Sequence, residues 1–138
     1  MRKILIVILS SVFVSSCHDS KEYTSTKTTV KKFQIVDFAE LLSRPNDFHG
    51  KPIETTGIFR AEFEHVGLYK SRWDSRGHNY KKAFWIEFDD SLKINDEEFE
   101  NLNNKRITVR GTVDAHSQGH LSEFAGSLTG ITYIREIF

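Results

Sequence analysis

The sequence predicts a mainly β domain, a small closed sheet of five strands with one or two short helices, behind an exported N-terminal segment. Three observations predict it. Apolar and polar residues alternate over five short runs, which is typical of half-buried strands. Two short segments instead have helical spacing. Two of the alternating runs carry a glycine at the same offset, which predicts two sharply bent strands.

The first half of the domain, which begins near Phe33, holds one predicted helix and two predicted strands. Val36, Phe38, Leu41 and Leu42 have roughly helical spacing, Asp37 can cap the N-terminus of this helix, and the helix ends before Pro45. The first strand follows a turn-rich stretch, and its core face is formed by Ile53, Thr55, Gly57, Phe59, Ala61 and Phe63. The second strand covers 66–70, and a polar loop with aromatic residues is predicted over 71–82.

The second half holds three more strands and a second helix. Residues 83–88 form the third strand, and 96–103 form a short helix that buries Phe99 and Leu102. The fourth strand covers 107–114, and 128–138 supply a fifth strand rich in β-branched and aromatic residues.

A repeated pattern, K-x-I-x-x-x-G-x-[FV], begins at Lys51 and again at Lys105, 54 residues later, and places Gly57 and Gly111 at the same offset. A glycine weakens a strand unless the strand bulges or bends there. Five strands, bends in the first and fourth, and a helix between the third and fourth predict an OB-fold-like barrel over residues 33–138. The alternative is another β-barrel or sandwich in which the two glycines coincide.

One resemblance agrees with this fold. The run from Leu41 to Ile53, Gly57 after it, Trp85 to Phe88, and the stretch from Gly119 to Ile131 look like a group of small exported bacterial OB-fold proteins. The similarity covers about Phe38 to Ile134. Its motifs are turn glycines and strand hydrophobics, and the group has no established activity. The resemblance therefore implies a fold rather than a function.

The N-terminus has the plan of a lipoprotein export signal. Arg2 and Lys3 precede an apolar stretch over 4–14, which is too short to span a bilayer as a helix. The ending Val14-Ser15-Ser16-Cys17 resembles the bacterial lipobox, which implies removal of residues 1–16 and lipidation of Cys17, including a palmitate. An ordinary secretory signal or a single anchor helix is the alternative. If the cell has two membranes, the resemblance to known lipoproteins also implies a location: His18 rather than Asp follows the cysteine, which in those proteins favours the outer membrane, facing the periplasm.

The mature chain would keep 122 residues (138 minus 16), enough for one domain. Its 17 basic and 19 acidic residues give a net charge of −2, since the removed segment holds two of the 19 basic residues. This balance exerts no general attraction on nucleic acid. Cys17 is the only cysteine, so no internal disulfide can form. Residues 17–32, rich in Ser, Thr and Lys, are predicted to be a flexible tether.

The segment from Tyr69 to Trp85 is the first candidate site. Five basic residues face a single acid there, interleaved with aromatic residues, and we single out Arg72, Trp73, Arg76 and Tyr80 as ligand-binding. Aromatic faces beside a positive groove hold single-stranded nucleic acid, but the envelope location opposes that ligand. An anionic glycan or peptide needs the same chemistry. The alternative is a solvated loop whose aromatics cap the barrel.

The second candidate group is Asp114, His116, His120 and Glu123. Two histidines four residues apart can bind a metal on one helical face, but Gly119 favours a loop here, and the spacing alone is a weak indication. No G-x-S-x-G elbow or phosphate-binding glycine loop is present, and we assign no catalytic residue and no cofactor.

Two functional hypotheses remain. The first is a non-catalytic, membrane-anchored binding module of the cell envelope, with an envelope protein or an anionic glycan or peptide as partner; a toxin-neutralising immunity lipoprotein is one subtype. The second is a small metal-binding protein or metal-assisted enzyme centred on His116 and His120.

Overall fold

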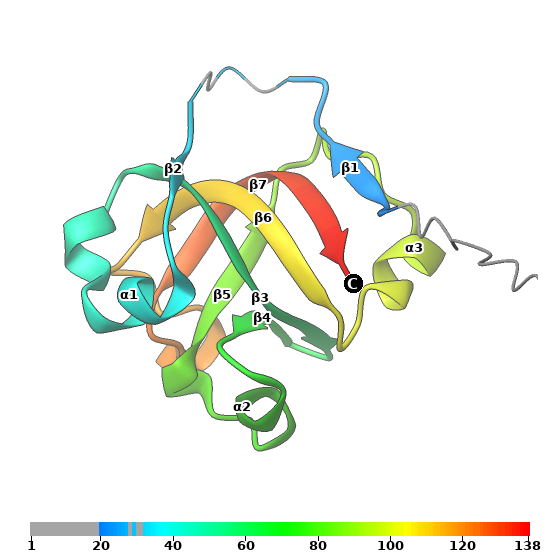
Figure 1. Ribbon diagram of the computed structural model, residues 1–138. Coiled ribbons are helices and arrows are strands. Elements are labelled where there is room, and N and C mark those ends of the chain that lie inside the picture. The colour runs from blue at the N-terminus through cyan, green and yellow to red at the C-terminus, as the bar shows by residue number, and fades with distance from the viewer. Residues whose placement is uncertain (1–19, 28, 30–31) are drawn as a thin grey trace, which may run out of the picture.

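Five strands pair in a closed ring in the computed structural model, which describes residues 20–27, 29 and 32–138 (Figure 1). Going round the ring, the order is β3 (Pro52–Glu62), β4 (His65–Tyr69), β5 (Ala83–Phe88), β7 (Ser127–Ile137) and β6 (Arg106–Asp114), which pairs again with β3. Neighbouring strands are antiparallel except β5 and β7, which are parallel. The mainly β fold predicted from the sequence is confirmed, and each of the five predicted strands lies within two residues of its expected bounds.

Two short strands extend the sheet outside the ring. β2 (Gln34–Ile35) runs parallel to β3, and β1 (Glu22–Thr24) runs antiparallel to β7. β5 pairs with β7 only as far as Ile131, and β1 pairs with the next part of β7, from Tyr133 to Arg135. β1 thus covers an edge of β7 that would otherwise be left open.

β1 corrects the prediction of a tether over 17–32, since residues 22–24 belong to the sheet. Tyr23 is buried, and Ser25 forms a bridge with Leu92. The sequence concealed this strand because it holds only one large apolar residue between polar ones, and its partner lies more than 100 residues away. Residues 17–19, 28, 30 and 31 of the predicted tether lie outside the described residues, as does the predicted signal segment.

The core fills the inside of the ring, because alternate residues of each strand point inward. Its largest fully buried side chains include Phe59, Leu68, Phe84, Ile107, Leu128 and Ile131. Burying a side chain of this size removes it from water at a gain of about 1.5 to 3 kcal/mol. Phe63 was predicted to face this core but is 88% exposed, since β3 ends at Glu62 and the chain turns at the hairpin tip.

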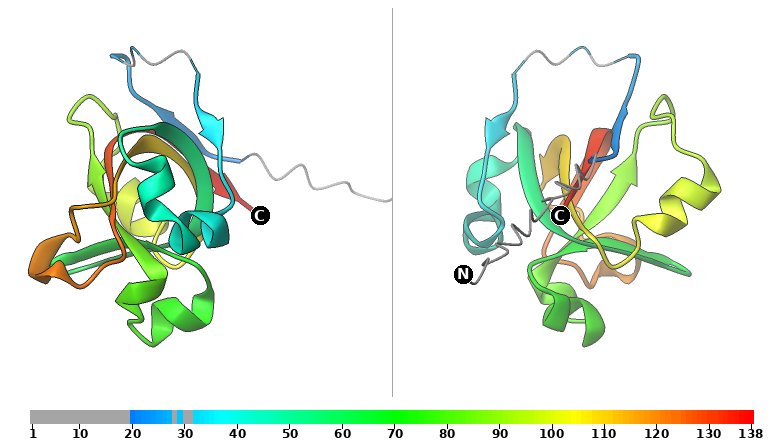
Figure 2. Two further views of the ribbon diagram at one scale, coloured as in Figure 1. Left: turned by 90° about the vertical axis from the view of Figure 1, so that its left-hand side faces the viewer. Right: turned by 45° about the vertical axis from the view of Figure 1, so that its right-hand side comes forward.

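Three short α-helices lie outside the ring (Figures 1 and 2). α1 (Phe38–Ser43) begins after Asp37, whose side chain accepts from two backbone N–H groups, and it ends before Pro45 as predicted. A one-turn 3-10 helix, η1 (Pro45–Phe48), follows. α3 (Asp96–Asn101), between β5 and β6, was also predicted, and a capping box of Asn95 and Glu98 closes its first turn.

The segment predicted as a loop over 71–82 contains α2 (Arg72–Arg76) and the 3-10 helix η2 (Tyr80–Lys82). Ser71 caps α2 by accepting the backbone N–H of Asp74. A helix of five residues is too short to show an apolar period, which is why the sequence pattern missed it. A third 3-10 helix, η3 (His120–Ser122), lies between β6 and β7. No helix in the described part of the chain is long and apolar enough to cross a membrane.

Candidate functional site

A cavity of about 370 Å³ lies between α2, β3 and the chain just before β6. Three arginines line it: Arg60 from β3, and Arg72 and Arg76 from the two ends of α2. The rest of the lining is Ile58, Ser75 and Asn104. Two of the four residues that the sequence predicted to bind a ligand, Arg72 and Arg76, therefore share one pocket.

Hydrogen bonds fix this pocket from both sides. Arg60 Nη1 donates to the Ser75 carbonyl at 2.9 Å, which ties β3 to α2, and Arg72 Nη1 donates to the Asn104 carbonyl at 3.2 Å. Asn104 has a φ of +63°, so the chain turns sharply where Arg72 meets it. The guanidinium groups of Arg60 and Arg72 are thus each held by a backbone carbonyl of another segment.

The pocket is electropositive. Arg60 is neutralised by Glu62, which accepts its Nε at 2.8 Å. Among the described residues, no carboxylate lies within ion-pair distance of Arg72 or Arg76. The Ser75 hydroxyl is buried and has no hydrogen-bond partner among the residues that the structure describes. Unsatisfied buried hydroxyls cost about 1 to 3 kcal/mol, so an anion that reached it would gain a bond there.

Trp73 lies beside the pocket on α2 and is 80% exposed. The Arg76 guanidinium lies 5.8 Å from the centre of its ring, within reach of a cation–π interaction. Trp73 is not part of the pocket lining, but its ring contacts Arg76, which is. The exposed ring offers a stacking surface next to that arginine.

Tyr80, the fourth predicted ligand-binding residue, belongs to a different cluster. Its ring stacks on His65 at 4.9 Å and packs on Phe124 at 5.1 Å, outside the arginine pocket. This second apolar cluster is centred on Ile58, Tyr69, Ala83 and Phe124. Burial is the main cause that raises the pKa of Tyr80. The ring therefore acts as a packing group, as in the alternative that the aromatics cap the sheet.

Glu62 contacts both Arg60, which lines the arginine pocket, and His78, whose ring lies against Tyr80. It accepts from Arg60, and its other oxygen lies 3.0 Å from His78 Nε2. These hydrogen bonds, above all the one from Arg60, hold the pKa of the Glu62 carboxyl below its ordinary value. The ionised form of Glu62 thus keeps Arg60, and through it α2, in place.

This arrangement predicts a pH-dependent contribution to stability. The folded pKa of Glu62 lies below the unfolded value of about 4.3, so ionised Glu62 stabilises the fold above that pH, and the gain is lost as the pH falls through the folded pKa. We expect Glu62→Gln to lower the melting midpoint at about pH 6, and the gap to the wild type to be smaller at about pH 3. A gap of equal size at both pH values would contradict the assignment.

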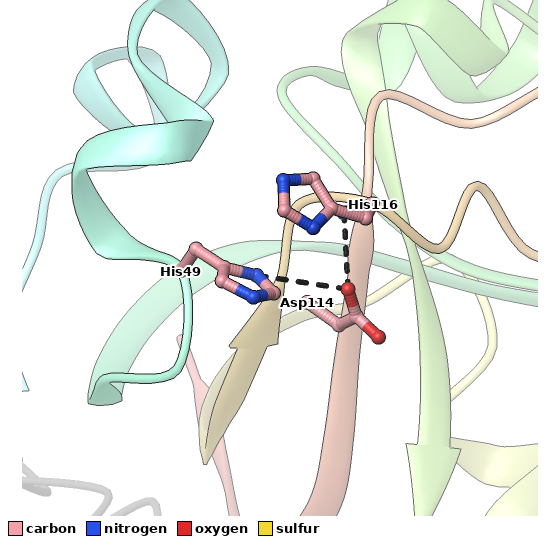
Figure 3. A group of neighbouring side chains, drawn as sticks. All are labelled: His49, Asp114 and His116. Carbon is pink, nitrogen blue, oxygen red and sulfur yellow. Dashed lines mark hydrogen bonds and ion pairs between the residues drawn. The ribbon is translucent and has the colours of Figure 1, made fainter.

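The histidines of the second candidate group are separated. His116 lies next to His49 and Asp114 (Figure 3). His120 Nε2 is instead 3.7 Å from Glu64, and Glu123 pairs with His65 at 3.3 Å. η3 includes Leu121 with a φ of +62°, so no regular helix aligns His116 with His120. His49 takes the place beside His116 that the sequence assigned to His120.

Sequence reasoning missed Arg60, Ser75 and Asn104 in the pocket. Arg60 was expected on the outer face of its strand, where it lies, but the chain folds α2 back over that face. Only the contact between distant segments reveals that Arg60 and Arg72 line the same cavity. Cys17 lies outside the described residues.

Comparison with known proteins adds little. No protein-family model matches the chain, and no curated protein matches it. A solved structure of a protein assigned as an aspartyl-tRNA synthetase from Leishmania major Friedlin is 14% identical, with a TM-score of 0.41. The match covers 82% of this chain and 22% of that one, so this chain spans about a fifth of that protein. The match is too distant for fold or function to be carried over from it.

Proposed function

We propose that this protein is a non-catalytic binding module that holds an anionic group of its partner in the arginine pocket. The observation that carries the proposal is the convergence of Arg60, Arg72 and Arg76 on one cavity of about 370 Å³. Two of these guanidiniums have no acidic partner within the described residues, so their charge is available to a ligand.

The chemistry of the lining favours a carboxylate or phosphate group. Arginine presents its donors in a planar fork that matches both groups, and such charge-assisted bonds are roughly twice as strong as neutral ones. The volume of the cavity is at the lower end of the range for ligand pockets, roughly 300 to 1,000 Å³. It therefore suits the charged end of a larger molecule, such as an anionic glycan or an acidic peptide segment, with Trp73 stacking on the part outside.

We propose further that the ring of strands is an OB-fold barrel. The support is the pairing order, in which the five strands close on themselves with a single parallel pair, β5 with β7, and α3 follows the third strand of the ring. OB-folds serve as scaffolds for binding oligonucleotides and oligosaccharides. A binding role is consistent with that scaffold, although function has to be argued from the site.

The anchoring proposal rests on the lipobox-like sequence at Cys17. If Cys17 carries the lipid, only four residues separate it from β1, and five extended residues reach at most about 18 Å. β1 and α2 lie at opposite ends of the domain, at the top and bottom of Figures 1 and 2. A protein anchored in this way would hold its β1 end against the membrane and present the arginine pocket away from it.

The proposed location is the outer membrane, facing the periplasm, and the proposed partner is an envelope protein or an anionic glycan or peptide. One form of this function is an immunity-type lipoprotein, whose arginine pocket would bind an acidic surface of the toxin that it neutralises. The phosphates of a nucleic acid would also fit the chemistry of this pocket. The proposed compartment and the absence of overall positive charge argue against nucleic acid as the ligand.

The test compares the double variant Arg72→Ala/Arg76→Ala with Arg44→Ala. Arg44 is an exposed arginine that pairs with Glu40 and Asp47 and does not line the pocket. Each protein is used to recover partners from solubilised envelope and is titrated with an acidic peptide and a uronic acid oligosaccharide. Arginine anchors commonly contribute about 2 kcal/mol each, so recovery or affinity should fall at least about 30-fold in the double variant alone.

The melting midpoints separate binding from folding. The two side chains are on the surface, so the double variant should unfold within about 0.5 kcal/mol per substitution of the wild type. Undiminished recovery by a folded double variant would mean that the pocket is not the binding site. Equal loss in Arg44→Ala would indicate nonspecific charge attraction instead.

A further inference from the structure

Three side chains with metal-ligand chemistry meet at the end of β6, apart from the arginine pocket. His49 lies on the turn between η1 and β3, Asp114 ends β6, and His116 follows two residues later (Figure 3). One ligand atom from each residue lies within 4.8 Å of the other two. None of the three lines the arginine cavity.

The backbone holds these segments together. The Gly50 N–H donates to the Val113 carbonyl at 2.8 Å, and the Val113 N–H donates to the Lys51 carbonyl at 3.1 Å, so the turn that carries His49 is fixed to the end of β6. Asp114 Oδ1 accepts the backbone N–H groups of His116 and Ser117. The same oxygen lies 3.7 Å from His49 Nδ1, so it both shapes the loop that presents His116 and faces the imidazole of His49.

The geometry points to a cation between these side chains, and we propose that His49, Asp114 and His116 bind a divalent transition-metal ion. Two imidazoles and a carboxylate suit Zn²⁺ and its neighbours rather than Mg²⁺ or Ca²⁺, which prefer oxygen ligands. Three protein ligands also leave a position for water or for a group of a partner.

Only a small rearrangement is needed. Zinc–nitrogen bonds of about 2.0 to 2.1 Å place tetrahedral ligand atoms roughly 3.3 Å apart, so the atoms have to approach by about 1.5 Å at most. The His49 side chain is 43% exposed, which leaves its ring free to turn while Asp114 keeps its two loop N–H bonds. The cost is one hydrogen bond, from the Ala115 N–H to His49 Nδ1 at 3.2 Å. The two imidazole rings already lie with their centres 4.2 Å apart, tilted by 34°.

The other histidines among the described residues provide a contrast. His65, His78 and His120 each face one glutamate, Glu123, Glu62 and Glu64 respectively. Within the described residues, only the group of His49, Asp114 and His116 combines three potential ligands at this spacing. His120→Gln is therefore a matched control, since it removes an exposed histidine beside a carboxylate without touching the proposed site.

The experiment measures Zn²⁺ binding to the full chain by calorimetry and Co²⁺ binding by visible absorption. The chain carries no polyhistidine tag and has Cys17 replaced by serine, so that no thiol competes for the metal. We expect one ion per chain, a Co²⁺ band, and a loss of affinity of at least about tenfold in His49→Gln and in His116→Gln. His120→Gln should bind as the parent does.

Asp114→Asn separates the two roles of the aspartate, because an amide oxygen can still accept the two loop N–H groups but carries no charge. We expect it to keep the melting midpoint and to weaken Zn²⁺ binding. Absence of Zn²⁺ binding by the folded parent, or equal affinity in the parent and in folded His49→Gln and His116→Gln, would overturn the proposal. Loss of affinity in His120→Gln alone would assign the metal to another site.

Discussion

Replacing Gly111 with valine should destabilise the domain by about 3 kcal/mol. A Cβ atom at this position would lie 2.6 Å from Ile131 Cδ1 and 2.9 Å from the carbonyl oxygen of Thr129. The side chain of Ile131 can turn aside, but the carbonyl belongs to β7, the neighbouring strand of the ring. Relief of the clash therefore requires two paired strands to separate. Gly57→Val should behave alike, since its Cβ would lie 2.8 Å from the Tyr69 carbonyl oxygen.

Urea unfolding of each variant measures this effect. The control is Glu87→Val, which introduces the same side chain at an exposed position of β5 and should change stability by no more than about 0.5 kcal/mol. Gly111→Ala should already lose much of the stability that Gly111→Val loses, because the clash arises at the Cβ atom. Midpoints of the glycine variants equal to that of Glu87→Val would mean that the strands tolerate a wider separation and that the repeated glycine pattern has no structural role.

These glycines explain why much of the ring could be predicted from the sequence. Each of its five strands alternates apolar and polar residues. The repeated pattern singled out Gly57 and Gly111 as bends, and in the structure they lie where two strands approach their neighbours too closely for a side chain. α1 and α3 were predictable for the same local reason. Asp37 and Asn95 cap them, and each has apolar residues at helical spacing.

The parts that escaped prediction depend on contacts between distant residues. β1 forms a strand because β7 extends beyond β5 and leaves an edge that residues 22–24 cover. No local pattern encodes the length by which one strand exceeds another. α2 is a single capped turn, and its packing over β3 rests on the bond from Arg60 to the Ser75 carbonyl.

The candidate sites follow the same division. The excess of basic residues between Tyr69 and Trp85 indicated a positive surface, and Arg72 and Arg76 do line one pocket. The sequence could not separate Tyr80 from them, because an aromatic residue that packs inward and one that faces a ligand look alike. It also associated His116 with His120, four residues on, whereas the fold brings His49 beside it from 67 residues away.

Replacing Cys17 with serine should abolish lipidation of the protein. Acyl transfer requires the thiol, so a serine at this position cannot receive the lipid. We expect complete loss of labelling by a tagged palmitate and an uncleaved or mislocalised precursor. The distribution of the protein between detergent and aqueous phases and its size on a gel give the two readouts.

The anchor and the domain can be tested independently, because β1 begins five residues after Cys17 and pairs with β7 through residues 22–24. Ser16→Ala keeps a small residue before the cysteine and should be labelled and processed normally, whereas Cys17→Ser should not. Both should keep the ligand affinity of the arginine pocket, which lies at the other end of the domain. If Cys17→Ser is still processed and still partitions into detergent, the lipobox interpretation is wrong, and the N-terminal segment acts as an ordinary signal or a single anchor helix.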